Sequence, residues 1–183
     1  MPLTSAFAFA EQWQDALTTH NTRLYAVPSP PQVAAAFVLQ HLLSIPAQLS
    51  AFAALSGPWQ IDLGTVDDAR ISCDLAPGLY PRRLGFLSVT AAAPEVEERI
   101  DGARTAYRVL GRAMAEVYPS PVKISSQQRL GMVEDLWEMA LRDARAAVVG
   151  QVAPAVQRRS CCFIHALPGC HECAGCPRTP TSG

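Results

Sequence analysis

The chain has 183 residues, of which 49% are hydrophobic and 17% are charged. This length suits one domain, and the hydrophobic share excludes a wholly disordered chain. The 15 Lys and Arg residues and 16 Asp and Glu residues leave a net charge of −1. General nucleic-acid binding is therefore not expected, because it requires many basic side chains to neutralise phosphates. We expect an α+β protein, mainly α-helical, with a small antiparallel sheet and a C-terminal Cys-rich loop segment.

A first amphipathic helix is predicted from Ser5 to about His20, with Ser5 as its N-cap. Its apolar face consists of residues spaced by three and four positions, namely Ala6, Phe9, Trp13 and Leu17.

A second helical region begins near Gln32, after the proline-rich run PSPP, which separates it from the first helix. From Val33 to Leu55 nearly every residue is apolar, and Pro46 predicts a kink or a break. The run is long enough to span a bilayer. The residues that interrupt it are Gln40, His41, Pro46 and Gln48. A buried helix pair is therefore the favoured interpretation, and membrane association is the minor alternative. We expect His41 to be a hydrogen-bonded core residue.

Short strands are predicted between Trp59 and about Thr90. The runs WQIDLG, ARISCDL and RRLGFLSV alternate in part and are separated by Gly and Pro. They predict two or three strands, arranged as an antiparallel meander. Cys73 lies in one of them and is interpreted as a small core residue, since free cysteine is usually buried.

Two long helices follow, separated by Pro119 and Pro121, and are predicted to pack as an antiparallel hairpin. The apolar positions of the first are Val96, Ile100, Ala103, Tyr107, Leu110, Met114 and Val117. Those of the second are Leu130, Val133, Trp137, Ala140, Ala144 and Val148. Ser125 or Ser126 is expected to cap the second helix.

Five of the six cysteines lie between Cys161 and Cys176, and the sixth is Cys73. A disulfide framework would spread its cysteines along the chain, so that the bridges close long loops. The first residues also lack the pattern of a secretory signal. We therefore expect a reducing cytoplasm and metal-bound thiolates.

The tail cysteines follow the spacing C-C-x10-C-x2-C, with Cys170 inside the gap. Four thiolates within so short a segment are enough to hold a soft metal centre. Side chains of adjacent cysteines diverge, which suits a two-iron centre better than a single zinc ion. The spacing favours an iron–sulfur cluster, and zinc binding and thiol redox chemistry remain alternatives.

These residues resemble the C-terminal signature of the FhuF-type ferric-siderophore reductases. The resemblance covers Arg159–Cys162, Leu167–Gly169 and Cys173–Pro177. It implies a [2Fe-2S] cluster and one-electron reduction of a ferric hydroxamate or related siderophore in the cytoplasm. The implied ligands are Cys161, Cys162, Cys173 and Cys176. Cys170 is additional to the signature and is interpreted as a spare thiol, with substitution for a neighbouring ligand as the alternative.

Five residues in or beside the tail carry or can gain positive charge: Arg158, Arg159, His165, His171 and Arg178. Such charge would raise the potential of a cluster and attract an anionic complex. The alternative for each is a solvated surface residue. No catalytic residue is assigned beyond the cluster, and four cysteines leave no need for a histidine ligand.

The expected function is one-electron reduction of ferric siderophore iron with release of Fe(II). The chain has no Gly-rich nucleotide motif and no flavin fingerprint, so an external electron donor is required. The alternatives are a zinc-binding structural or interaction module, and an iron–sulfur carrier or sensor without a siderophore substrate. We divide the chain into a helical body (1–157), a cluster-binding segment (158–178) and a loose tail (179–183).

Overall fold

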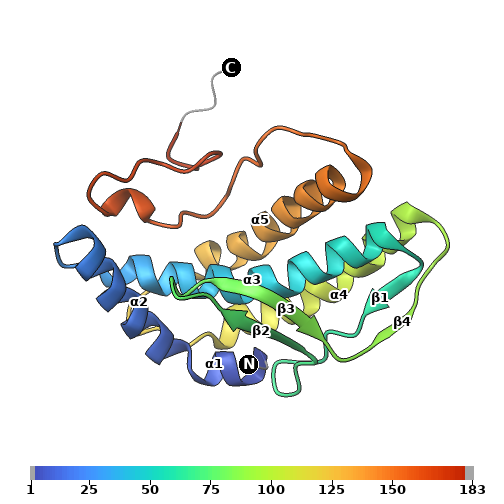
Figure 1. The fold of residues 1–183 in the computed structure, drawn as a ribbon, viewed down its shortest axis with the longest axis horizontal. Helices are drawn as coiled ribbons and strands as arrows, with labels where there is room; N and C mark the ends of the chain where they lie inside the picture. Colours follow the sequence, from blue (N-terminus) through green and yellow to red (C-terminus); the bar gives the residue numbers. More distant parts are fainter. Residues whose placement is uncertain (1–2, 180–183) are drawn as a thin grey trace.

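The computed structural model describes residues 3–179 and is mainly helical, which confirms the expected fold class (Figure 1). Its α-helices are α1 (Leu3–Ala8), α2 (Ala10–Tyr25), α3 (Pro31–Ser56), α4 (Val96–Val117) and α5 (Ser126–Ala144). Its strands are β1 (Trp59–Ile61), β2 (Ile71–Leu75), β3 (Pro81–Phe86) and β4 (Val89–Ala91). A π-helical turn, Arg145–Val149, continues α5, and a 3-10 turn, Ile164–Ala166, lies in the tail. The loose-tail residues 180–183 lie outside the described part of the chain.

Helix α3 is the central element and packs against α2, α4 and α5. It begins at Pro31, where the missing proline N–H costs nothing. Pro46 lies inside it without ending it, so the predicted break is wrong. Neighbouring helices enclose this stretch, and we infer that their packing compensates for the lost backbone hydrogen bond. Within residues 3–179, α3 alone is long and apolar enough to span a membrane, but 67% of its most apolar window is buried in the fold.

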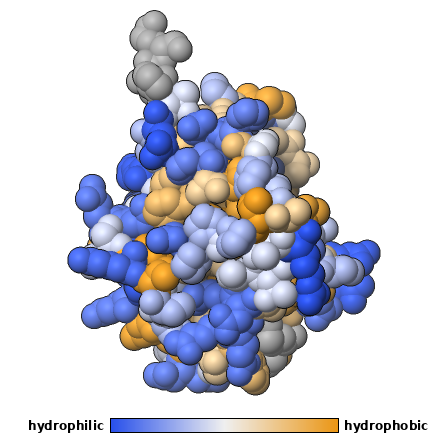
Figure 2. All heavy atoms as spheres, turned by 90° about the vertical axis from the view of Figure 1, so that its left-hand side faces the viewer, coloured by the Kyte–Doolittle hydropathy of each residue, from blue (hydrophilic) through white to orange (hydrophobic). Residues whose placement is uncertain are grey.

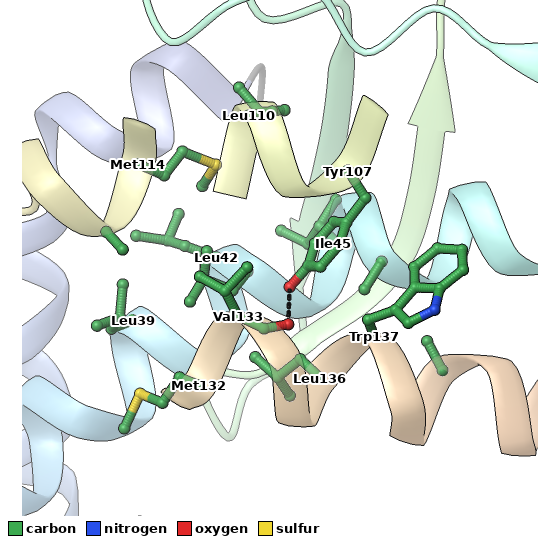
Figure 3. Packing of buried hydrophobic residues seen from close by; sticks show 14 of the residues in the cluster. Leu39, Leu42, Ile45, Tyr107, Leu110, Met114, Met132, Val133, Leu136 and Trp137 are labelled. Atoms are coloured by element: carbon green, nitrogen blue, oxygen red, sulfur yellow. Dashed lines mark hydrogen bonds between the residues drawn. The ribbon is translucent and has the colours of Figure 1, made fainter. Parts of the chain in front are cut away.

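The core lies where α4 and α5 meet α3 (Figure 3). The hydroxyl of Tyr107 donates a hydrogen bond to the carbonyl of Val133, with 3.0 Å between the oxygens. The predicted apolar faces are buried along most of both helices: Ile100, Ala103, Tyr107, Leu110, Met114, Val133, Trp137, Ala140 and Ala144. The prediction is wrong at the ends, where Val96, Val117, Leu130 and Val148 are exposed.

The predicted first helix is divided into α1 and α2 at Phe9, which is half-exposed. Ser5 lies inside α1 and therefore is not the N-cap. Trp13 and Leu17 are buried as expected. The indole N–H of Trp13 donates to the carbonyl of Leu79 at 2.9 Å, so α2 also holds the turn between β2 and β3.

The strands form two separate two-stranded antiparallel sheets. Strands β2 and β3 form a hairpin, and β1 pairs with β4 across it, with Ile61 opposite Val89. The predicted meander is therefore wrong, because β1 pairs outside the hairpin and not with β2. The connection between β1 and β2 contains the ion pair of Asp62 and Arg70. Cys73 in β2 is 2% exposed, and burial raises its pKa, in agreement with a core residue.

Candidate metal centre

The tail is fixed to the body by a buried carboxylate on α5. Asp135 is 1% exposed and accepts hydrogen bonds from the backbone N–H groups of Arg159 and Ser160, at 2.9 and 2.8 Å. The hydroxyl of Ser160 donates to the same carboxylate at 2.6 Å. A buried carboxylate is tolerated when donors surround it in this way. The residues directly before Cys161 therefore have one defined position.

Sequence reasoning missed Asp135. It stands beside apolar residues in the α5 pattern, and a carboxylate on the buried side of a helix is the signal that was available. Its partners follow about 25 positions later and have no periodic relation to it. Spacing alone therefore could not connect the two segments.

The start of α5 provides a second attachment. The predicted cap is confirmed, since the Ser125 hydroxyl accepts from the N–H of Gln128 at 3.2 Å. The side-chain amide of Gln128 donates to the carbonyl of Cys161. The first turn of α5 and the adjacent-cysteine pair are thus linked directly.

The two ends of the tail also meet. The N–H of Arg158 donates to the carbonyl of Gly175 at 2.8 Å. Gly175 has a φ of +72°, and a Cβ there would lie 1.9 Å from the carbonyl oxygen of Val156. Glycine is required on both counts. The segment is therefore a closed loop that brings the Cys173–Cys176 turn back to its start.

Two of the cysteine thiols are direct neighbours inside this loop. The sulfurs of Cys162 and Cys173 are 3.8 Å apart. Two thiolates on one tetrahedral metal, with bonds of about 2.3 Å, have sulfurs about 3.8 Å apart. Cys161 lies near enough to Cys176 and Cys173 for their charges to raise its pKa, although burial is the larger cause.

Among the described residues, no three Cys, His, Asp or Glu side chains are grouped tightly enough to surround a single ion. A [2Fe-2S] cluster needs two irons with two protein ligands each, so pairs of thiols suit it. Burial, followed by the neighbouring Cys162, raises the pKa of Cys173. Loading a metal there would therefore release protons. The cysteines present fit the group.

The side chain of Cys170 contacts α2 and not the other cysteines of the tail. Its sulfur lies 3.3 Å from the hydroxyl of Tyr25 on α2, and this hydrogen bond raises the pKa of Tyr25. The contact is consistent with the predicted spare role of Cys170.

The charged residues of the tail differ in their surroundings. Arg159, His171 and Arg178 are exposed, as the solvated-surface interpretation expects. His165 is half-buried, with Nδ1 3.9 Å from the sulfur of Cys161. Arg158 is 6% exposed, so for this residue the surface interpretation is wrong. Its guanidinium turns inward toward the cysteines because side chains from α3 and from the tail itself hold it.

Two adjoining clefts lie beside the tail and share Phe37 and Ile164 in their walls. The larger, of about 320 Å³, has Cys162 and Cys173 in its lining together with Arg158. The smaller, of about 210 Å³, is lined mainly by aromatic, histidine and aliphatic side chains of α2, α3 and the β2–β3 turn. The surface at the α2 end of the molecule mixes apolar and hydrophilic side chains (Figure 2).

Residues 158–178 match the family model described as the FhuF 2Fe-2S C-terminal domain. The tail is an FhuF-type [2Fe-2S] segment. The match covers this FhuF-type tail and none of the α-helices α1–α5. No curated protein and no solved structure shows a significant match to the chain. Both the sequence resemblance and the expected cofactor are thereby confirmed, whereas the individual ligands stay a prediction.

Proposed function

We propose that this protein is a cytoplasmic ferric-siderophore reductase, with Cys161, Cys162, Cys173 and Cys176 as the ligands of its cluster. The observation that carries the proposal is the FhuF-type tail, whose family is associated with siderophore iron reduction. A cytoplasmic location suits thiols that must stay reduced.

The cleft beside Cys162 and Cys173 is the place where we expect the ferric complex to approach. A [2Fe-2S] cluster held there supplies one-electron transfer. Arg158 and Arg142 line the same cleft, each beside a carboxylate, and their guanidinium N–H groups suit the oxygen donors of a ferric complex. The cleft is smaller than a whole siderophore complex, so we expect the complex to rest at its mouth.

Reduction also accounts for release. One electron converts the bound Fe(III) to Fe(II), and hard oxygen donors hold the less charged ion more weakly. The electron must reach the protein from an external one-electron donor. The chain itself then needs to bind the complex near the tail and keep the cysteines in place.

The test uses anaerobically purified protein, reduced with dithionite and freed of excess reductant. A ferric trihydroxamate complex is added, the visible spectrum is followed, and Fe(II) is captured by a specific chelator. We expect one Fe(II) for each reduced protein, together with return of the oxidised spectrum. The gallium(III) trihydroxamate has the same shape and charge but accepts no electron, and it should leave the protein reduced.

Other outcomes separate the alternatives. A colourless protein with one zinc per chain would contradict the redox proposal. A reduced protein that ignores the ferric complex but passes its cluster to an apo-ferredoxin would be a carrier. Metal analysis, EPR of the reduced protein and an acceptor assay distinguish these cases.

A further inference from the structure

Arg158 is the buried cation of the FhuF-type tail. Its Nη1 lies 3.7 Å from the sulfur of Cys173, within hydrogen-bonding distance for sulfur. Its side chain is 4% exposed, so water does not screen this contact. Arg159, the next residue, carries the same charge on the surface. The chain thus contains two adjacent arginines in opposite environments.

The guanidinium of Arg158 is held by side chains from α3, from α5 and from the tail itself. Nη2 donates to the side-chain oxygen of Gln40 on α3 at 3.1 Å and lies 3.4 Å from the hydroxyl of Ser160. Its Nε lies 3.9 Å from the carboxylate of Asp135. A long side chain fixed at several points keeps one orientation, and here that orientation directs Nη1 at Cys173. Gln40 is therefore a positioning residue for this contact.

We propose that Arg158 sets the reduction potential of the [2Fe-2S] cluster by donating a hydrogen bond to the thiolate of Cys173, and that Gln40 positions it. The cluster gains one negative charge on reduction, so a buried cation and an N–H group at a ligand sulfur stabilise the reduced state. The contact makes the protein easier to reduce. It also attaches the tail to α3, which belongs to the body.

This inference rests on Cys173 as a ligand and does not depend on the siderophore. It therefore holds for a reductase and for an electron carrier alike. If Cys173→Ser leaves the cluster bound and spectroscopically unchanged, the ligand assignment fails. If Cys173→Ser removes the cluster, the assignment stands and the role of Arg158 is tested separately.

The experiment is a redox titration of the loaded protein, followed by EPR and the visible spectrum, in Arg158→Gln and in the matched control Arg159→Gln. Hydrogen bonds to charged groups are the stronger ones in proteins. We therefore expect Arg158→Gln to shift the redox equilibrium about tenfold toward the oxidised form, a fall of about 59 mV for one electron. Arg159→Gln should shift it far less.

A second variant protects the test against a failure to fold. Gln40→Leu keeps Arg158 but removes the acceptor that orients it, so the potential should fall in the same direction by a smaller amount. Unchanged potentials in the loaded Arg158→Gln protein, or in Gln40→Leu if the first variant does not load, would overturn the proposal. An equal shift in Arg159→Gln would overturn it too, because net charge alone would then explain the effect.

Discussion

Ser160 donates to the buried Asp135 carboxylate both from its backbone N–H, at 2.8 Å, and from its hydroxyl, at 2.6 Å. The contact joins the residue before Cys161 to the middle of α5. A short irregular segment has few apolar contacts of its own, so such polar attachments decide whether it has one conformation.

Replacement of this carboxylate should release the tail. Asp135→Ala leaves the buried donors of Arg159 and Ser160 without an acceptor and should lower the free energy of unfolding by about 3 kcal/mol. Cluster content should fall with it. Urea unfolding and iron analysis measure the two effects. Asp143→Ala is the matched control on the same helix, because Asp143 is half-exposed and its loss should cost at most about 0.5 kcal/mol. Equal effects of the two variants would contradict the anchoring role.

Serine substitution should divide the cysteines into two groups. Changes at the four proposed ligands should remove the visible absorption and the EPR signal of the reduced protein. The residues in this group are Cys161, Cys162, Cys173 and Cys176. Cys170→Ser and Cys73→Ser should keep both signals, since one contacts Tyr25 and the other lies in the core. Loss of the cluster in Cys170→Ser, with retention in one of the four, would reassign the ligand set.

Closure of the tail should depend on one glycine. Gly175→Ala places a Cβ against the carbonyl of Val156 and adds the cost of a positive φ, about 1–2 kcal/mol. The loop must open, and we expect iron and sulfide per chain to drop sharply. Gly169 has the same φ of +72°, but a Cβ there meets no atom within 4 Å. Gly169→Ala therefore has the conformational cost of the positive φ without the close approach. A cluster content that falls equally in both variants would show that backbone strain, and not the close approach, is responsible.

Stability should depend on pH through His41. Its ring stacks on Trp13 with 5.8 Å between the centroids, and burial lowers its pKa from 6.5 to about 4. Below pH 6.5 the unfolded chain takes up a proton that the folded chain does not, so stability present at pH 7 is lost as the pH falls. The loss should be about 2 kcal/mol between pH 7 and pH 5.

His41→Gln tests this dependence, because glutamine does not titrate. The difference in unfolding free energy between variant and wild type, measured in the same buffers at both pH values, isolates the histidine. A difference that does not change with pH would contradict the prediction.

The periodic spacing of apolar residues predicted the long helices of this chain. The spacing of residues such as Tyr107 and Trp137 predicted α4 and α5 and their buried faces, because one side of each helix packs along its length. The same reasoning failed at Val117 and Leu130, which are exposed although the spacing places them on the apolar faces. It failed again at Pro46, because the tertiary packing of α3 overrides a local helix breaker.

The candidate site was predictable in part for a different reason. Cysteines in an unusual spacing are informative in themselves, so the metal segment could be identified without a fold. The residues that hold this segment in place could not be predicted, since Gln40 and Asp135 contact the tail from positions distant in the chain. The inward-turned guanidinium of Arg158 contacts Gln40 directly and lies 3.9 Å from Asp135. Nothing in the sequence distinguishes this arginine from Arg159 beside it.

The order of these supports along the chain has a consequence for biosynthesis. Helices α3 and α5, which hold Arg158 and Ser160, are both translated before Cys161–Cys176. The N-terminal part of a chain begins to fold while the rest is still on the ribosome. The helices that hold the tail can therefore be folded when the cysteines leave the ribosome. Iron and sulfide would then bind to a tail whose supporting contacts on α3 and α5 are already available. Cofactor assembly would then follow the folding of α3 and α5.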